Sequence, residues 1–146
     1  METKTDIWQF QAQLAEKLLA WSGASVAGGS GLLLRGDRFW RGFGSQCVGW
    51  GAIDALIAAL GLRGALTKAD TPDAHTPERQ THERTTLRRI LWLNFGLDVG
   101  YVAGGMALAL TRGKRDRFLR GVGWGIVFQG GFLFFFDLLH VLHLRE

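Results

Sequence analysis

Cysteine is almost absent from this chain, and so is an apolar leader. Cys47 is the single cysteine among 146 residues, which excludes an intramolecular disulfide bond and a zinc site built from cysteines. The first sixteen residues carry Glu2, Asp6 and Glu16 and contain no apolar run. We therefore expect no cleavable signal peptide, because such a peptide needs a continuous apolar core.

Two signatures of enzymes are also missing. The glycine-rich run 121–125 has neither the strand–turn–helix context nor the lysine of a phosphate-binding loop. We find no nucleophile paired with a base and no other catalytic constellation. The sequence therefore predicts a protein that is not an enzyme and that carries no cofactor.

Neither sign of charge dominates: 17 Lys and Arg stand against 13 Asp and Glu, for a net charge of +4. The basic residues are densest in two short segments, 35–41 and 111–120. Short basic segments between hydrophobic stretches favour the anionic headgroups of a lipid bilayer over nucleic acid as the partner. We expect both segments to be cytoplasmic loops of a bacterial inner-membrane protein, with both termini on the other side.

Hydrophobic residues form four long stretches, although the mean hydropathy is only +0.08 because a polar region near the middle dilutes them. The last stretch, 121–144, would span ~36 Å as a helix, enough to cross a bilayer. The first is weakly hydrophobic and rich in Gly, Ala and Ser, so we expect it to need partner helices. The sequence predicts an all-α bundle of four transmembrane helices in one domain, with spans at 18–34, 39–62, 90–110 and 121–144.

Two polar helices are predicted to extend beyond the membrane on the side of the termini. Residues 5–17 carry apolar side chains at three- and four-residue steps, which is typical of an amphipathic helix. Residues 63–76 are polar and are predicted to form a loop. Thr76 followed by Pro77 is typical of a helix N-terminus, and we expect a polar helix from there to residue 89.

The chain contains an internal duplication. The segment RFWRGFG at 38–44 matches RFLRGVG at 117–123. Each copy is followed by a glutamine that precedes an aspartate by eight residues, Gln46 and Asp54 in the first and Gln129 and Asp137 in the second. We predict two tandem helical-hairpin repeats, over about 1–62 and 77–146, related by a pseudo-twofold axis along the membrane normal.

Three tracts in the second half also suggest a family. They are NFGLDVGY at 94–101, RGVG at 120–123 and QGGFLFFFD at 129–137. With these tracts the chain resembles an uncharacterised bacterial family of small four-helix integral membrane proteins, most strongly over residues 90–139. The resemblance implies a membrane location, and it implies no activity.

Three acidic residues fall inside the predicted spans. Asp54, Asp98 and Asp137 each lie eight or nine residues from the arginine at the terminus side of their span, so their carboxyl groups should share one depth, ~12–14 Å from those arginines. We expect them to face the bundle interior, because exposing a carboxylate to lipid is costlier. No basic residue is predicted at that depth. Burial and mutual repulsion then favour a protonated carboxyl group or a shared cation.

This cluster supports two functions of different classes. The first is a proton- or cation-coupled transporter or channel, whose binding candidates are the three acids with Gln46, Gln129, Asn94 and Tyr101. The second is a scaffold or assembly protein in which the same groups, with Ser22, form a neutral network that fixes helix register, while the projecting helices bind an unidentified protein. Four short helices leave little room for a central pathway, so transport would suit a homodimer.

The remaining polar candidates have simpler interpretations. Arg38, Arg41, Arg117 and Arg120 are interpreted as anchors that extend to the membrane interface, with a site for an anionic lipid or ligand as the alternative. His140 and His143 follow Asp137 at three-residue steps. A metal site there is the weaker hypothesis, and we favour histidines at a helix end near the interface.

Overall fold

The computed structural model describes residues 5–144, and every long element in that range is helical. The elements are α1 (Ile7–Leu33), α2 (Arg38–Ala69), α3 (Pro77–Leu110), a single 3-10 turn η1 (Arg112–Lys114) and α4 (Arg117–His143). The prediction of an all-α, four-helix chain is confirmed, and the described part of the chain contains no strand.

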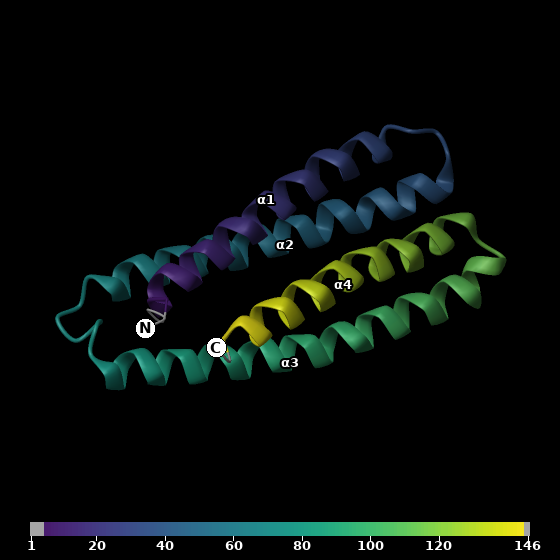
Figure 1. Ribbon diagram of the computed structural model, residues 1–146. Coiled ribbons are helices and arrows are strands. Elements are labelled where there is room, and N and C mark those ends of the chain that lie inside the picture. The colour runs from purple at the N-terminus through teal and green to yellow at the C-terminus, as the bar shows by residue number, and fades with distance from the viewer. Residues whose placement is uncertain (1–4, 145–146) are drawn as a thin grey trace.

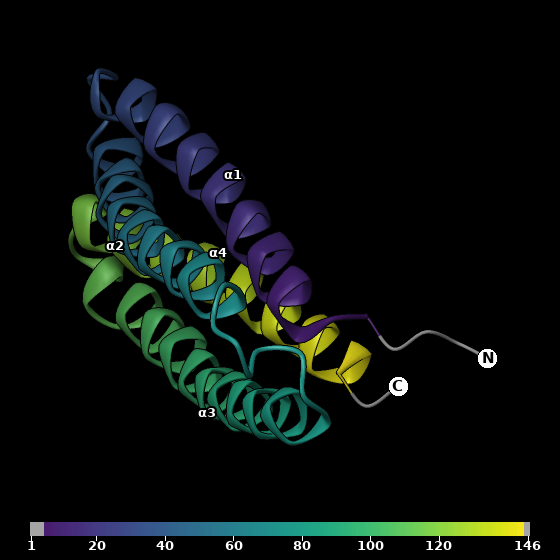
Figure 2. The ribbon, with the colours of Figure 1, turned by 90° about the vertical axis from the view of Figure 1, so that its left-hand side faces the viewer.

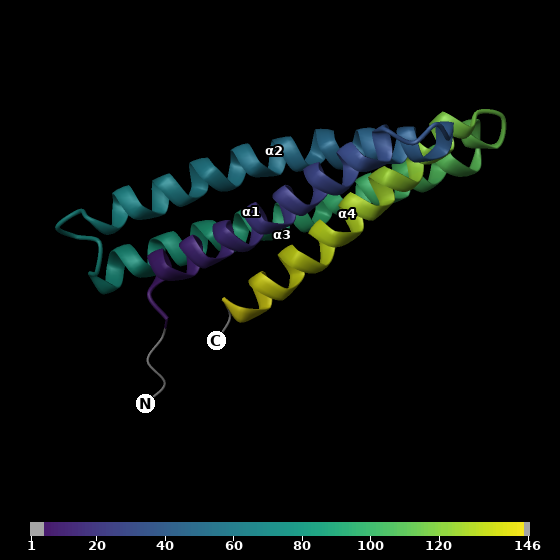
Figure 3. The ribbon, with the colours of Figure 1, turned by 90° about the horizontal axis from the view of Figure 1, so that it is seen from above.

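The four helices form two hairpins that pack side by side. Helices α1 and α2 make the first hairpin and α3 and α4 the second, with both tight turns at one end and both termini at the other (Figure 1). Viewed more nearly end-on, α2 and α4 lie between α1 and α3 (Figure 2). Helices α2 and α4 lie together near the tight turns and diverge toward the termini (Figure 3). This divergence leaves space between helices in the half of the bundle nearest the termini.

Each helix begins at a side chain that accepts a hydrogen bond from a free backbone N–H group. Asp37 accepts from the N–H of Phe39, and Asp116 accepts from that of Phe118. Thr76 caps α3 with Pro77 in its first turn, as predicted. A negative charge at a helix N-terminus also interacts favourably with the helix dipole. These caps fix where each helix leaves its turn.

The loop predicted over 63–76 is wrong for its first seven residues. Helix α2 continues through them to Ala69, and only 70–76 connect α2 to α3. The segment has no proline before Pro72, and Ala65 is 1% exposed. Burial of this small side chain offsets the polar composition, so the helix persists for almost two more turns.

Glycine permits the two hairpins to meet at backbone distance. A Cβ atom on Gly42 would overlap the carbonyl oxygen of Phe118, and one on Gly121 would overlap that of Phe39. Within the hairpins, a Cβ on Gly29 would lie 2.8 Å from the carbonyl oxygen of Gly44. Any side chain at these positions would push the helices apart. Glycine therefore permits close helix packing both between the hairpins and within them.

The predicted helical extensions pack on their own chain. Ile7 is fully buried, and Trp8 donates a 2.9 Å hydrogen bond from its indole nitrogen to the carbonyl of Ala74. The backbone N–H of Ile7 donates to the side chain of Gln80 at 2.9 Å. The apolar face of the first extension is thus covered by the 70–76 loop, α3 and the end of α4, including Val141.

Three segments are long and apolar enough to cross a membrane: α2, Pro77–Lys114 and α4. Among the described residues, α1 does not reach the same hydropathy. This agrees with the weak hydrophobicity of the stretch 18–34.

Candidate functional site: an acidic cleft between α2 and α3

A cleft of about 580 Å³ opens between α2 and α3, in the half of the bundle nearest the termini. Its two walls are faces of α2 and α3, and its floor is formed by α1 and α4. The side chains along the walls are mostly apolar, and several reach the outer surface, as Ile57 does at 57% exposure. The apolar lining includes Trp50, Ile53, Ile57, Ile90, Leu97 and Tyr101 from the walls and Leu14, Leu18, Leu133 and Phe136 from the floor.

The three acids predicted to share one depth meet in this cleft. Asp54 comes from α2, Asp98 from α3 and Asp137 from α4. Their exposed fractions are 3%, 3% and 6%. They are therefore the most polar groups in an otherwise apolar cavity, as expected for acids that face the bundle interior.

The carboxyl groups are close enough to interact directly. Asp98 and Asp137 lie within side-chain hydrogen-bonding range of each other. Two ionised carboxylates at this range have no proton to donate and would repel each other, so a proton held between them would stabilise the pair. Asp54 interacts electrostatically with Asp98 and with Asp137. Three negative charges at such separations in an apolar cavity would repel strongly, and the cluster therefore favours holding a proton or another positive charge.

Two oxygen atoms of the cluster have no partner. The Oδ2 atoms of Asp54 and Asp98 are buried and accept no hydrogen bond from any described residue. A buried polar group left without a partner costs about 1–3 kcal/mol. Acids that served only to join helices would be expected to use these oxygens. The geometry instead leaves two buried acceptors without a partner on residues that line the cavity.

The other predicted polar candidates divide between two places. Asn94 and Tyr101 line the cleft, and the Tyr101 ring packs edge-on against Trp50 with centroids 4.9 Å apart. Gln46 packs against the backbone of Gly125, where α2 crosses α4. Gln129 is fully buried on the other side of α4. The structure therefore brings Asn94 and Tyr101 to the acids and places the two glutamines elsewhere.

Gln129 belongs to a separate polar network whose members satisfy one another. It accepts a 3.2 Å hydrogen bond from the indole of Trp21 and donates one of 3.2 Å to Ser25. It also lies within hydrogen-bonding range of Cys47. Ser22, a further member of the predicted network, donates instead to the carbonyl of Leu18 at 2.7 Å. The network at Gln129 is therefore a different one from the network predicted around the acids, because Trp21 and Ser25 are not among the predicted members.

Three of the four arginines considered as anion ligands bind partners within the chain. Arg38 pairs with Asp116 at 3.3 Å, and Arg117 pairs with Asp37 at 2.8 Å. Arg120 donates to the carbonyl of Gly113 at 2.8 Å, and Arg41 is exposed on the surface of α2. These contacts join the two tight turns to each other, and they leave Arg41 as the best-placed candidate for a lipid headgroup.

The two C-terminal histidines bond to their own helix. Nδ1 of His140 lies 2.6 Å from the carbonyl oxygen of Phe136, and Nδ1 of His143 lies 2.8 Å from that of Leu139. Within residues 5–144, no group of three or more His, Cys, Asp or Glu side chains is arranged to hold a metal ion. The geometry thus gives no support to a metal site at Asp137.

Sequence reasoning missed the pair that bounds the outer end of the cleft. Lys68 lines it there, 3.5 Å from Glu83, which is also 3.2 Å from Arg79. Lys68 falls in the loop predicted over 63–76, and Glu83 lies in a segment whose polar composition is typical of an exposed helix. Glu83 was therefore not recognisable as a residue whose side chain is only 9% exposed.

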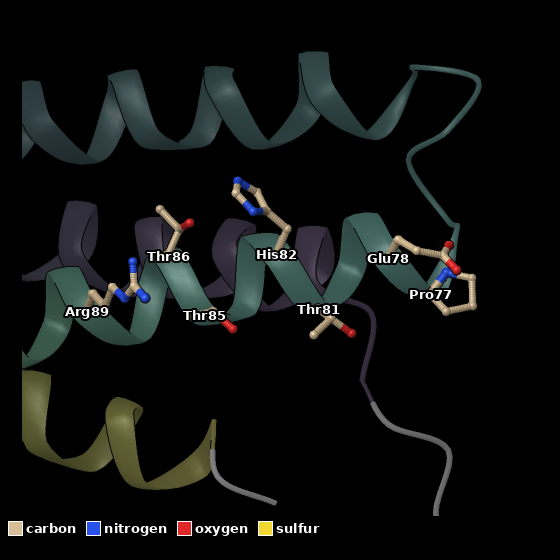
Figure 4. Close-up of a pocket in the computed structure, with 7 residues that line it drawn as sticks. All are labelled: Pro77, Glu78, Thr81, His82, Thr85, Thr86 and Arg89. Carbon is tan, nitrogen blue, oxygen red and sulfur yellow. The ribbon is translucent and has the colours of Figure 1, made fainter.

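A second, shallower hollow follows the outside of α3 near its start (Figure 4). Its volume is about 530 Å³. His82 and Thr86 point toward α2, whereas Thr81 and Thr85 point away from it (Figure 4). This surface is polar, contains one acid and one arginine, and has no buried charge. Its lining is Pro77, Glu78, Thr81, His82, Thr85, Thr86 and Arg89.

Comparison with known proteins gives a family and no activity. No curated protein matches the chain, and no solved structure matches it. A family model described as a family of unknown function (DUF6992) matches residues 17–138. That range includes all three acids, the whole of α2 and α3, and most of α1 and α4. The chain therefore belongs to this family of unknown function, DUF6992.

Proposed function

We propose that this protein is an integral membrane protein whose Asp54, Asp98 and Asp137 bind a proton in coupled transport across the bilayer. The observation that carries the proposal is the meeting of three buried acids in a cleft where two of their oxygens lack partners. Ionisable groups inside membrane helices are costly unless they bind or conduct something.

A bilayer explains the outer surface of the bundle. Leu56 and Leu60 on α2 are each 61% exposed, and Leu93 on α3 is 64% exposed. Water would make such a surface prone to aggregation, whereas lipid tails cover it without cost. Helix α1 would cross the bilayer with the others because it packs closely along α2 at Gly29. The basic turns would then lie on the cytoplasmic side of a bacterial inner membrane.

The contacts between the hairpins support two tandem repeats. Arg38 pairs with Asp116 in one direction, and Arg117 pairs with Asp37 in the other. A Cβ atom on Gly42 would overlap the carbonyl of Phe118, and a Cβ atom on Gly121, the matching position of the second repeat, would overlap the carbonyl of Phe39. Reciprocal contacts between matching positions are what a pseudo-twofold axis between two copies of one unit produces.

A proton suits the cluster better than a metal ion does. A proton shared between Asp98 and Asp137 would relieve the repulsion between their carboxylates, and the described residues form no group of ligands arranged for a metal ion. Loss of that proton would leave an additional negative charge in the cleft. The site could therefore alternate between holding a proton and holding a positively charged substrate.

Flux measurements in liposomes test the proposal. Asp137→Asn should lower proton flux by about tenfold or more, because the amide cannot bind and release a proton. Asp70→Asn is the matched control, since Asp70 is exposed and lies at the end of α2. Equal proton flux in the wild type and Asp137→Asn, or none in either with or without a candidate substrate, would overturn the proposal.

A scaffold remains the second candidate, and the hollow on the outside of α3 is the observation that favours it. The apolar face of residues 5–17 is already covered, so a partner would have to contact the polar surface at Thr81 and His82. A co-purifying protein that is lost in a Thr81→Glu, His82→Glu variant, but retained in Asp137→Asn, would support this function over transport.

A further inference from the structure

The geometry points to one substrate class for the α2–α3 cleft: a lipophilic organic cation, with one positive charge carried on an apolar or aromatic body. This inference rests on the proposed function, because it requires an acid cluster that can give up a proton. The juxtaposition that carries it is an apolar cavity of about 580 Å³ lined by Asp54 and Asp98, each of which has one buried carboxyl oxygen without a partner.

The walls of the cleft exclude a small hydrated ion. Ile53, Ile57, Ile90 and Leu97 offer no hydrogen-bonding groups to a hydration shell, and they line the approach to the acids. Cavities of this size and character hold drug-sized organic molecules. A ligand with an apolar body would fill the volume and cover these side chains.

The three acids in the cleft disfavour an anionic ligand and, less strongly, a neutral one. The only basic residue among the described lining is Lys68, which lies at the outer end and is paired with Glu83. Near the acids there is no positive charge to balance a carboxylate or phosphate. A neutral molecule would leave the negative charge of these carboxyl groups unbalanced, and one without a hydrogen-bond donor would also leave the Oδ2 atoms of Asp54 and Asp98 without a partner. A cationic group would compensate both.

Trp50 and Tyr101 add a further site for positive charge. Their rings pack at 64° to each other and both line the cleft, one turn of helix from Asp54 and Asp98 respectively. Aromatic ring faces attract organic cations, most strongly where water is excluded. A quaternary or protonated amine bound near the acids can therefore contact ring faces and carboxylates together.

The cleft is also accessible from the side. Ile53, Ile57 and Leu97 line it and are 50%, 57% and 50% exposed. In a bilayer this opening faces the lipid tails, where lipophilic cations accumulate. Binding would be an exchange, in which the cation takes the place of the proton held by the cluster and the proton leaves to water.

Tetraphenylphosphonium is a suitable probe, with tetraphenylborate as the anion of nearly the same size and shape. Binding to the purified protein in lipid nanodiscs would be measured by calorimetry. We expect tetraphenylphosphonium to bind and tetraphenylborate to bind about a hundredfold more weakly or not at all. Affinity should rise by about tenfold per pH unit where one proton is displaced per cation.

Two pairs of variants locate the site. Asp98→Asn should weaken tetraphenylphosphonium binding by about tenfold, whereas Asp70→Asn should leave it unchanged. Gly61→Leu should also weaken binding, because Gly61 lines the cleft and an added Cβ meets open space there. Gly49→Leu is its control, since Gly49 lies on the same helix, has equal free space and does not line the cleft.

The outcomes separate this inference from the proposed function. Equal binding of the phosphonium and the borate, or binding unaffected by Asp98→Asn and Gly61→Leu, would overturn the substrate class. If proton flux depends on Asp137 while tetraphenylphosphonium does not bind at any pH, the substrate class is wrong and proton transport stands. Absence of both flux and binding in folded protein would overturn both.

Discussion

The bundle has two sides where the hairpins face each other, one between α1 and α4 and one between α2 and α3, and these two sides are filled differently. On the α1–α4 side, Trp21 stacks on Phe132 with centroids 3.6 Å apart and donates a hydrogen bond to Gln129. On the α2–α3 side, Trp50 meets Tyr101 only at an edge, and the space beyond them is the cleft. The first side is closed by aromatic packing, whereas the second is left open.

The difference concerns polar groups as much as volume. Gln129 is fully buried, and it forms hydrogen bonds with Trp21 and Ser25. The acids on the opposite side are buried almost as fully, yet two of their oxygens accept nothing. A polar group whose partners all lie in the same chain stabilises the fold, whereas one without partners is available to a ligand. The comparison is the reason why we propose a structural role for the polar groups of the first side and a binding role for those of the second.

The largest expected effect concerns the aromatic residues of the two sides. Trp21→Ala should lower the free energy of unfolding by about 3 kcal/mol, because it removes a stacked ring and leaves Gln129 short of a donor. Trp50→Ala should cost about 1 kcal/mol, since only an edge contact is lost. Unfolding by denaturant in mixed micelles, followed by circular dichroism, compares the two. A cost at Trp50 as large as that at Trp21 would show that the cleft side is packed equally well.

Replacement by leucine at two buried polar residues should lower stability at one and not at the other. Gln129→Leu should lower the free energy of unfolding by about 2 kcal/mol, because Ser25 and Trp21 lose their partner. Asp54→Leu should leave it unchanged or raise it by about 1 kcal/mol, because a buried oxygen without a partner is removed. The same denaturation assay gives both values. Strong destabilisation by Asp54→Leu would mean that the acids hold the bundle together.

The smallest expected effect is at the terminus end, where α1, part of the cleft floor, is joined to the 70–76 loop. Partial burial raises the pKa of Asp6, but hydrogen bonds from the Trp8 N–H and His75 outweigh it and hold this pKa below its ordinary value of 3.8. Because the folded pKa is lowered, the stabilisation is complete above pH ~3.8 and is lost as pH falls through the folded value.

Hydrogen exchange at the start of α1 measures this loss. Protection of the amide groups of residues 7–10 should fall when the wild type is acidified through that range, after correction for intrinsic rates. Asp6→Asn should show weaker protection at neutral pH and less change on acidification. Amide groups of α1 near Trp21, on the aromatic α1–α4 side, should keep their protection in both proteins. Loss of protection along the whole of α1 would instead show that its start does not unfold separately from the rest.

Counting residues along the sequence located the acids but did not reveal the cleft. Asp54, Asp98 and Asp137 could be placed at one depth because an α-helix rises by a constant amount per residue. The walls of the cleft could not be predicted, because the gap between α2 and α3 depends on how far α2 and α4 separate toward the termini. Lys68 was missed for a related reason, because the length of α2 depends on the burial of Ala65 against its neighbours.

Glycine shows the same limit. The sequence contains small-residue ladders on the first and third helices, of which Gly28, Gly100 and Gly104 are members. A Cβ at each of these would meet open space, whereas one at the adjacent Gly29 or Gly105 would contact the neighbouring helix closely. Small residues make close helix packing possible, but neighbouring residues point about 100° apart around a helix. The orientation of each helix therefore decides which glycines lie at the interface.

The sequence by itself determined the four helices, most of their ends and the inward-facing acids, because these follow from periodicity, capping residues and composition within one segment. The tertiary structure decided which polar residues satisfy one another and which remain without partners. Gln129 and Asp137 belong to the same copy of the repeated motif of glutamine and aspartate, yet Gln129 bonds to Ser25 on α1, whereas Asp137 lies beside Asp98 on α3. Such pairing depends on distances between segments that are remote in the chain, and only the packed bundle sets those distances.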